Sequence, residues 1–309
     1  MTMMKHLFGA TTALALLFAG PAGAQTAPAP APTAAAAAAT VDADPALWVI
    51  KRGNATVYLF GTVHVLKPGL SWFDEEVKAA FDRSDRLILE LPDVDEKASQ
   101  PLVLKLATDT SGVPLTKKLP EADRVAYEKA MAGLGIPAAA FDQFEPWFAA
   151  INLGLIPLLK LGYDPSSGAE KTLLAAAKQE HKPVAGLESL EQQLGYFDSM
   201  PEKLQIKYLA ETVKDLPKAG ENIDKMVAEW AKGDPDALAK TLNEGLDAQP
   251  ELAKLLLADR NKRWAVVIDD MLSRPGTTFI AVGAGHLAGK DSVQNQLKRY
   301  GVTATRVAY

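Results

Sequence analysis

The sequence predicts an α/β protein with a central mixed or mostly parallel sheet, flanking helices and an inserted helical cap. Short apolar, β-branched runs alternate with segments of helical period, which is typical of strands joined by crossover helices. The stretch from about residue 95 to 272 is largely helical by the same criterion, and the chain ends in a β-α-β pattern. We therefore expect both ends of the chain to form the sheet and the middle helices to cover it.

The first expected elements are a hairpin, a helix and a short buried strand. The turn Arg52-Gly53-Asn54 separates two alternating runs, which favours an antiparallel hairpin. Ser71 precedes a helical pattern as a candidate N-cap, with Glu75 nearby. In chain order the expected ranges are Leu47–Ile50, Thr56–Phe60, Trp72–Arg83 and Leu87–Leu89.

Glycine and proline divide the middle of the chain into helices. The apolar run from Trp147 to Leu161 is too short, at about 15 residues, to cross a bilayer, so we expect a buried core helix. The later expected elements are a helix at Ala169–Glu180, strands at Pro183–Leu187 and Thr277–Val282, a helix at Ser292–Tyr300 and a strand at Val302–Ala308.

Composition limits the available chemistry. The chain has 309 residues, 33 basic and 38 acidic side chains, a formal charge of −5, four histidines and no cysteine. The absence of cysteine excludes disulfides, thiolate nucleophiles and Cys-ligated zinc or iron–sulfur sites. An acidic balance without a block of Lys or Arg argues against nucleic acid as a partner. Any metal or nucleophilic chemistry must therefore use His, Asp, Glu, Ser or Lys.

The amino terminus has the pattern of a signal peptide. Residues 1–24 combine a charged start, the apolar run Leu7–Gly20 and the small-residue ending Ala22-Gly23-Ala24. Residues 25–44 are rich in Ala and Pro, which predicts a disordered linker, and residues 45–309 form the α/β domain. We expect an exported protein, periplasmic or secreted, without an integral membrane segment after cleavage.

One motif occurs twice in the chain. Thr56–Val65 aligns without gaps on Thr278–Leu287, and each is a buried strand followed by Gly-x-x-His and an apolar residue. The glycine permits a sharp turn, so that His64 and His286 lie beyond the strand ends. Ligands of open α/β sheets bind outside the carboxyl ends of the strands, which makes both histidines candidate site residues.

Two further predicted strands end in Glu90 and Glu188, so four strand ends supply two imidazoles and two carboxylates to one rim. Two His and one Glu are the ligand set of several catalytic zinc sites, and the same donors suit Mn(II), Co(II) or Fe(II). A metal-bound water would be a nucleophile at neutral pH. Ordinary alternatives stay open: histidines that only stabilise loops, a solvated Glu90, and a Glu188 that interacts with a helix dipole.

Other signatures of nucleotide binding or hydrolysis do not match. Gly283–Gly289 follows a strand, but its third glycine falls one place too late for a dinucleotide loop. The P-loop, the Gly-x-Ser-x-Gly elbow and the His-Glu-x-x-His helix are absent from the sequence.

The paired Gly-x-x-His motifs, with Leu89-Glu90, Gly186-Leu187-Glu188 and Arg260-Asn261, resemble the TraB/PrgY/GumN family, whose animal relatives are the TIKI proteases. The resemblance covers about residues 45–309. It implies an α/β fold akin to the erythromycin-esterase and ChaN group. It also implies a divalent-metal-dependent hydrolase, with peptide cleavage in the TIKI branch.

The resemblance assigns roles to individual residues. His64 and His286 would bind the metal, which would be Mn, Co or Zn, and Glu90 would be the partner carboxylate or general base. Arg260 would hold a substrate carboxylate or stabilise an oxyanion through its planar donors. Substrate contacts are also implied for the remaining candidates, Glu188 and Asn261.

A surface ion pair with Asp259 or Glu251 is the alternative role for Arg260. His6 falls in the signal peptide, and His181 ends a helix before Lys182-Pro183, where capping is the expected role. The sequence thus predicts an exported metal-dependent hydrolase acting on a peptide or small molecule. A non-catalytic periplasmic protein that binds a peptide, haem or metal is the second hypothesis. A partner-binding helical region with purely structural histidines is the third.

Overall fold

The computed structural model describes residues 40–92, 94–246 and 250–309. The predicted signal peptide and residues 25–39 of the predicted linker lie outside the described residues. Val41–Asp42 form β1, which pairs in parallel with β4 (Leu70–Ser71), and Ala43 is buried. The folded part therefore includes residues that precede the boundary expected at residue 45.

The predicted α/β class is confirmed by a six-stranded mixed sheet of order β6-β5-β7-β3-β2-β8. The four strands from β6 to β3 run parallel, whereas β2 is antiparallel to both β3 and β8. The strands are β2 Leu47–Arg52, β3 Ala55–Thr62, β5 Arg86–Leu89, β6 Val184–Gly186, β7 Gly276–Gly283 and β8 Thr305–Arg306.

The last strand and the first helix differ from what the sequence predicts. The last strand, β8, is only two residues long and pairs antiparallel with β2 rather than beside β7, because β3 and β5 already occupy both edges of β7. The first helix, α1 (Glu75–Asp82), begins later than expected. Asp74 is its N-cap, since Ser71 lies in β4 and its hydroxyl bonds the Asp74 carboxylate.

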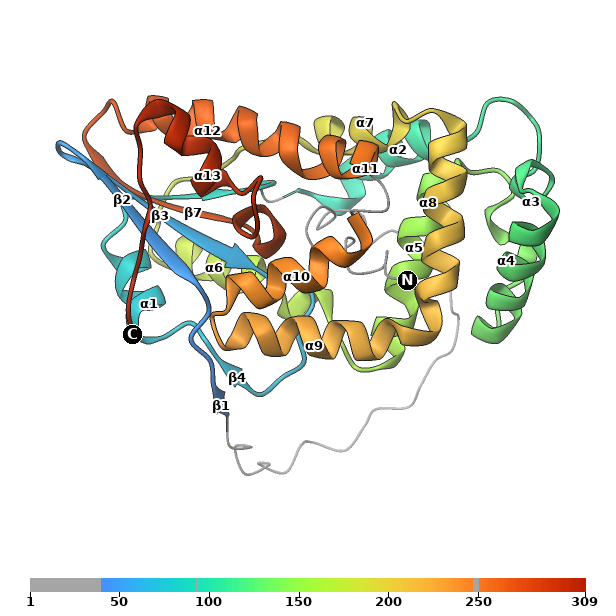
Figure 1. Cartoon of the computed structure of the whole chain (residues 1–309), viewed down its shortest axis with the longest axis horizontal. Coiled ribbons are helices and arrows are strands. Elements are labelled where there is room, and N and C mark those ends of the chain that lie inside the picture. Colours follow the sequence, from blue (N-terminus) through green and yellow to red (C-terminus); the bar gives the residue numbers. More distant parts are fainter. Residues whose placement is uncertain (1–39, 93, 247–249) are drawn as a thin grey trace.

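Both faces of the sheet are apolar, with the period of two expected of a buried strand. In β3, Val57 and Leu59 belong to the core on one face, and Phe60 belongs to the core on the other. Figure 1 shows α12 and α13 above the sheet and α6 and α9 below it. The helices that contribute to these cores include α12 Asp259–Met271 and α13 Val293–Leu297 on the first face, and α1, α6 Ala169–Gln179 and α9 Ala219–Ala231 on the second.

Between β5 and β7 the regular elements other than β6 are helices. Figure 1 shows α3, α4, α5 and α8 gathered beyond the ends of β3 and β7. Helix α5 contains the apolar run from Trp147 up to Lys160, and residues 147–154 and 158 of it are buried in the core as expected, whereas Leu159 and Leu161 are exposed. No helix within the described ranges is long and apolar enough to cross a membrane. The remaining helices are α2 Glu96–Ala107, α3 Leu115–Lys118, α4 Glu121–Leu134, α5 Pro146–Lys160, α7 Leu190–Asp198, α8 Glu202–Asp215, α10 Pro235–Leu246 and α11 Pro250–Ala253.

Candidate functional site

The four candidate residues at strand ends follow adjacent parallel strands, in the order β6, β5, β7, β3. Glu188, Glu90, His286 and His64 therefore lie at the same edge of the sheet, as the sequence predicts. All four side chains are buried, with His286 at 0% and Glu90 at 1% exposure. We use the name polar centre for these four residues together with three buried residues that contact them, which are described below: Arg260, Asn261 and Glu170.

The two Gly-x-x-His turns leave the sheet side by side. Strand β3 pairs with β7 so that Gly61 lies opposite Val282 and Thr62 opposite Gly283. A Cβ atom on Gly61 would lie 3.1 Å from both Cα and Cβ of Ala284, in the turn that carries His286. The first glycine thus permits the close approach of the two turns.

His64 contacts a carboxylate that the sequence did not single out. Its Nδ1 lies against Oε1 of Glu170, in the first turn of α6, and the Thr62 hydroxyl donates to the same oxygen at 2.5 Å. The backbone N–H of Ala169 donates to the Val63 carbonyl at 3.0 Å, which fixes the start of α6 against the histidine turn. A carboxylate only accepts hydrogen bonds, so His64 carries a proton on Nδ1.

Burial and charge oppose each other in this pair. Burial alone would lower the pKa of His64, but the Glu170 carboxylate offsets it and raises that pKa above its ordinary value. Burial alone would raise the pKa of Glu170, but His64 and the Thr62 hydroxyl lower it. Both directions describe an imidazolium–carboxylate pair held in a dry environment.

Arg260 joins the two predicted glutamates. Its Nη2 donates to Glu90 at 2.5 Å and to Glu188 at 2.6 Å, and its Nε donates to Glu188 at 2.9 Å. Burial alone would lower the pKa of Arg260, but these two carboxylates raise it. The alternative of a surface ion pair with Asp259 or Glu251 is wrong, because Arg260 is only 1% exposed.

Each glutamate has further donors. The Glu90 carboxylate accepts from the Gly283 N–H at 3.1 Å and from Gln193 at 2.8 Å, so the alternative of a solvated Glu90 is also wrong. The Glu188 carboxylate accepts from the indole N–H of Trp264 at 3.0 Å. Such saturation is expected for charges removed from water.

Asn261 fixes the tautomer of His286. Its Nδ2 donates to the backbone carbonyls of His286 at 3.3 Å and Asp291 at 2.8 Å, which orients the amide. Its Oδ1 then faces Nδ1 of His286 at 2.6 Å, so this nitrogen is the donor. Nε2 is the acceptor nitrogen, and Nη1 of Arg260 lies 3.3 Å from it.

The other two histidines lie apart from the polar centre. His181 is exposed at the end of α6, with a positive φ of 54°. This backbone conformation is common where a helix ends, which agrees with the expected capping role. His6 lies outside the described residues.

Sequence reasoning missed four contributors: Glu170, Thr62, Gln193 and Tyr196. The hydroxyl of Tyr196 donates to Glu188 at 3.2 Å. Glu170 has one weak indication in the sequence, because it is an acidic residue just after Gly168 at the start of a predicted helix. An acid at that position is usually explained by the helix dipole. Thr62 lies inside the first Gly-x-x-His motif, at a position that the motif leaves open, and Gln193 and Tyr196 follow no periodic or motif pattern that would single them out.

The donor types suit a divalent metal. Metal-binding histidines usually donate their second ring N–H to an oxygen, as His64 does to Glu170 and His286 does to Asn261. In addition, Oε2 of Glu170 is buried without a hydrogen-bond partner. In the part of the chain that the structure describes, no three His, Asp or Glu side chains are grouped closely enough to hold an ion as they stand. Arg260 donates to the same nitrogen of His286 that a metal would use, so the two contacts exclude each other.

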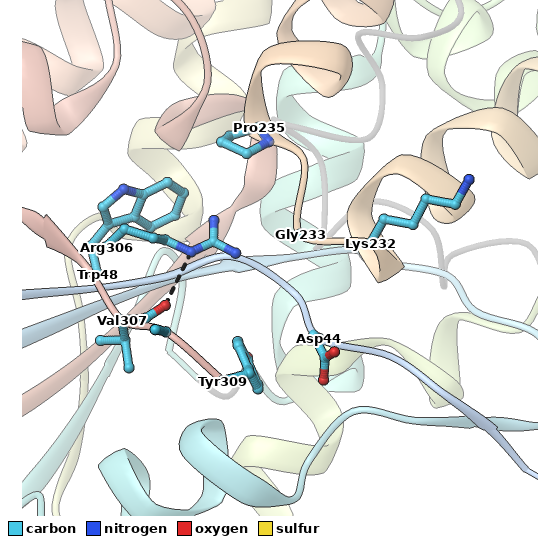
Figure 2. A pocket seen from close by; sticks show the side chains of 9 residues that line it. Asp44, Trp48, Lys232, Gly233, Pro235, Arg306, Val307 and Tyr309 are labelled. Atoms are coloured by element: carbon cyan, nitrogen blue, oxygen red, sulfur yellow. Dashed lines mark hydrogen bonds between the residues drawn. The ribbon is translucent and has the colours of Figure 1, made fainter.

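A cavity of about 520 Å³ lies beside the polar centre, between α11, α12 and the turn of His286, and its wall includes Asn261 and Gly285. Figure 2 shows a different pocket, formed by Trp48, Gly233 and Arg306 with their neighbours. None of the predicted site residues belongs to the lining of that second pocket. Of these two pockets, the first therefore adjoins the candidate chemistry.

Fold and site together define an α/β protein with a buried cluster of acidic and basic side chains at the carboxyl edge of its sheet. A sequence model of the TraB/PrgY/gumN family matches residues 46–306, and the chain belongs to this family. The predicted family is thus confirmed. No solved structure matches the chain, and the expected likeness to the erythromycin-esterase and ChaN group stays a prediction.

Two relatives illustrate the spread of the family. The chain is 26% identical over 260 residues to "Uncharacterized protein YbaP" of Escherichia coli (strain K12), which covers 82% of this chain and 92% of the relative. It is 23% identical over 270 residues to an "Uncharacterized protein" of Treponema pallidum (strain Nichols), covering 82% of this chain and 80% of the relative.

Proposed function

We propose that this protein is a hydrolase whose reaction takes place at the polar centre. One observation carries the proposal: the two histidines of a repeated strand-turn motif each have Nδ1 held by an oxygen from a different helix. This leaves Nε2 as the basic nitrogen of each ring. An imidazole oriented by a carboxylate or amide is the usual general base of hydrolytic enzymes.

The polar centre offers distinct roles for its side chains. His64, oriented by Glu170, would take a proton from the attacking water once its imidazolium has lost its own proton. Arg260 would stabilise the negative charge that develops on the substrate oxygen, since its guanidinium is fixed and desolvated. Glu90 and Glu188 hold Arg260 in place.

We further propose that a divalent metal, Mn, Co or Zn, takes part. Its candidate ligands are His64, His286 and Glu90, and the ion would lower the pKa of a bound water. With the ion bound, Nε2 of His64 would be a ligand, and the lowered pKa of that water would replace His64 as the general base. The donor types and the orphaned Oε2 of Glu170 support this part of the proposal. We also propose that the substrate is a peptide and that the protein is exported to the periplasm or secreted, on the family resemblance and the pattern of residues 1–24.

The test is a comparison of wild-type chain with His64→Ala and His286→Ala on a peptide library, with and without added Mn(II), Co(II) or Zn(II). Loss of a general base lowers kcat by roughly 10²- to 10⁴-fold, and we expect losses of this order. His181→Asn is the matched control, because His181 is exposed and asparagine tolerates its backbone conformation.

The outcomes separate the parts of the proposal. Saturable peptide binding without turnover would contradict the hydrolase and favour the non-catalytic binding protein. Turnover that persists in chelator, with no metal retained by the folded wild type, would contradict only the metal. Equal activity of His64→Ala and His181→Asn would contradict the role of the polar centre.

A further inference from the structure

The cavity beside the polar centre has the size and composition of a ligand site. Its volume of about 520 Å³ lies within the range typical of small-molecule and cofactor pockets. Its walls come from α11, from the wider helical turn Lys254–Ala258, from α12 and from the residues that follow the His286 turn. The turn Lys254–Ala258 has the hydrogen-bond pattern of a π-helix, which occurs frequently at functional sites.

The side-chain amide of Asn261 lies between this cavity and His286 of the polar centre. Asn261 lines the cavity and also holds the ring of His286 through its Oδ1. Gly285, the residue directly before His286, lines the cavity as well. Because glycine has no side chain, a ligand in the cavity contacts the backbone of the histidine turn directly. An occupant is therefore adjacent to His286.

The charge around the cavity is mainly positive. Lys254, Lys262 and Lys290 line it, whereas Asp291 is the one acidic residue among the lining residues that the structure describes. The first two lysines share a single carboxylate, that of Asp259. Lys290 forms no ion pair with any residue in the described ranges. The lysines thus outnumber the acids that neutralise them, which favours an anionic ligand.

The remaining lining is apolar or small, with Ala253, Leu257, Ala258 and Ala288. A ligand that fits both features has carboxylates next to short aliphatic groups. We propose that this cavity is the binding site for an acidic peptide, which is the substrate of the polar centre. The inference rests on the proposed hydrolase function and specifies its substrate class.

The test uses two dansyl-labelled peptide amides, Ala-Leu-Glu-Glu-Ala and Ala-Leu-Gln-Gln-Ala, titrated against the full chain at low ionic strength. Fluorescence anisotropy reports binding, and mass spectrometry of the same samples reports cleavage. We expect the acidic peptide to bind about tenfold more tightly, because each partly exposed ion pair contributes up to about 1 kcal/mol. The preference should shrink at high salt.

Two variants place the peptide in the cavity. Lys262→Glu/Lys290→Glu reverses two lining charges and should abolish the preference for the acidic peptide. Lys117→Glu/Lys129→Glu, on exposed positions of α3 and α4, makes the same change in net charge and should leave the preference intact. Ala288→Phe fills the cavity and should weaken the binding of both peptides.

Equal affinity for the two peptides would overturn the proposal. So would an unchanged preference in Lys262→Glu/Lys290→Glu, or one reduced equally in the control. Tight binding that survives Ala288→Phe would place the peptide elsewhere and would also overturn it. Specific binding of the acidic peptide without cleavage would support the binding site and contradict the hydrolase activity. Cleavage of both peptides without a charge preference would support the hydrolase activity and contradict the acidic-peptide site.

Discussion

At the scale of single residues, the two histidines of the polar centre are held at the same ring nitrogen, Nδ1, by two different kinds of side chain. Glu170 from α6 holds Nδ1 of His64, and Asn261 from α12 holds Nδ1 of His286. A carboxylate raises the pKa of its histidine, whereas a neutral amide adds no charge. Of the two histidines in the repeated motif, His64 therefore favours the imidazolium form. The amide of Asn261 sets the tautomer of His286 and itself carries no charge.

The loss of Arg260 should lower the stability of the fold strongly. It neutralises two carboxylates that are 1% and 6% exposed, and Arg260→Met would leave them buried without a counter-charge. Removing one partner of such a buried pair typically costs about 3–5 kcal/mol. We expect a loss of this size in the free energy of unfolding at neutral pH, measured by urea denaturation.

Arg274→Ala is the matched control for Arg260→Met. Arg274 forms an ion pair with Asp270, but their side chains are 69% and 60% exposed. Exposed pairs contribute about 0–1 kcal/mol because water screens them, so the control should change stability by no more than that. Similar losses in both variants would contradict the buried ion-pair arrangement of Arg260.

The sequence predicted the strand-end residues but not their partners. His64, Glu90, Glu188 and His286 each follow an apolar run, and the rule for parallel strands places them at one edge. Glu170 approaches from a helix that begins more than a hundred residues after His64, with no shared motif. Long-range contacts of this kind depend on how α6 docks, which local patterns do not encode.

At the scale of elements, the start of α6 is set by close backbone contact with the first histidine turn. A Cβ atom on Gly168 would lie 2.4 Å from the carbonyl oxygen of His64 and 3.2 Å from Oε2 of Glu170. Real side chains do not approach a backbone oxygen this closely, so α6 would have to move away. The contact between His64 and Glu170 thus depends on the absence of a side chain at Gly168.

Gly168→Ala should therefore destabilise the protein by about 1–3 kcal/mol, the usual cost of forcing extra atoms into a packed interior. Gly133→Ala in α4 is the control, because its Cβ would meet nothing within 4 Å. Helix propensity predicts that the control stabilises the fold by about 0.5–1 kcal/mol. Urea denaturation measures both, and a neutral Gly168→Ala would contradict the close docking of α6.

The elements themselves were predictable where one period dominated. Strands β3 and β7 alternate between two apolar cores, and α6 has the expected apolar face. The end of the chain was not predictable in detail, because the pairing of β8 depends on which sheet edge is open rather than on its own residues. Likewise Asp74 replaced Ser71 as the N-cap, since pairing with β1 holds Ser71 in β4.

At the scale of the whole molecule, the buried charges link stability to pH. His64 has a raised pKa in the folded state, so its contribution is fully present below its ordinary value of 6.5 and is lost as pH rises through the raised value. Glu170 has a lowered pKa, so its contribution is present above its ordinary value of 4.5 and is lost as pH falls through the lowered value. Both contributions are complete only between pH 4.5 and 6.5.

The difference in free energy of unfolding between wild type and Glu170→Gln should therefore be largest in this window and fall on both sides. Urea denaturation from pH 4 to pH 9, in buffer with chelator, measures it. Glu121→Gln, an exposed acid in the first turn of α4, is the control and should change the free energy of unfolding only slightly. A Glu170→Gln difference that stays constant above pH 6.5 instead of falling would mean that His64 is neutral in the fold. The His64–Glu170 contact would then be a neutral hydrogen bond rather than an ion pair.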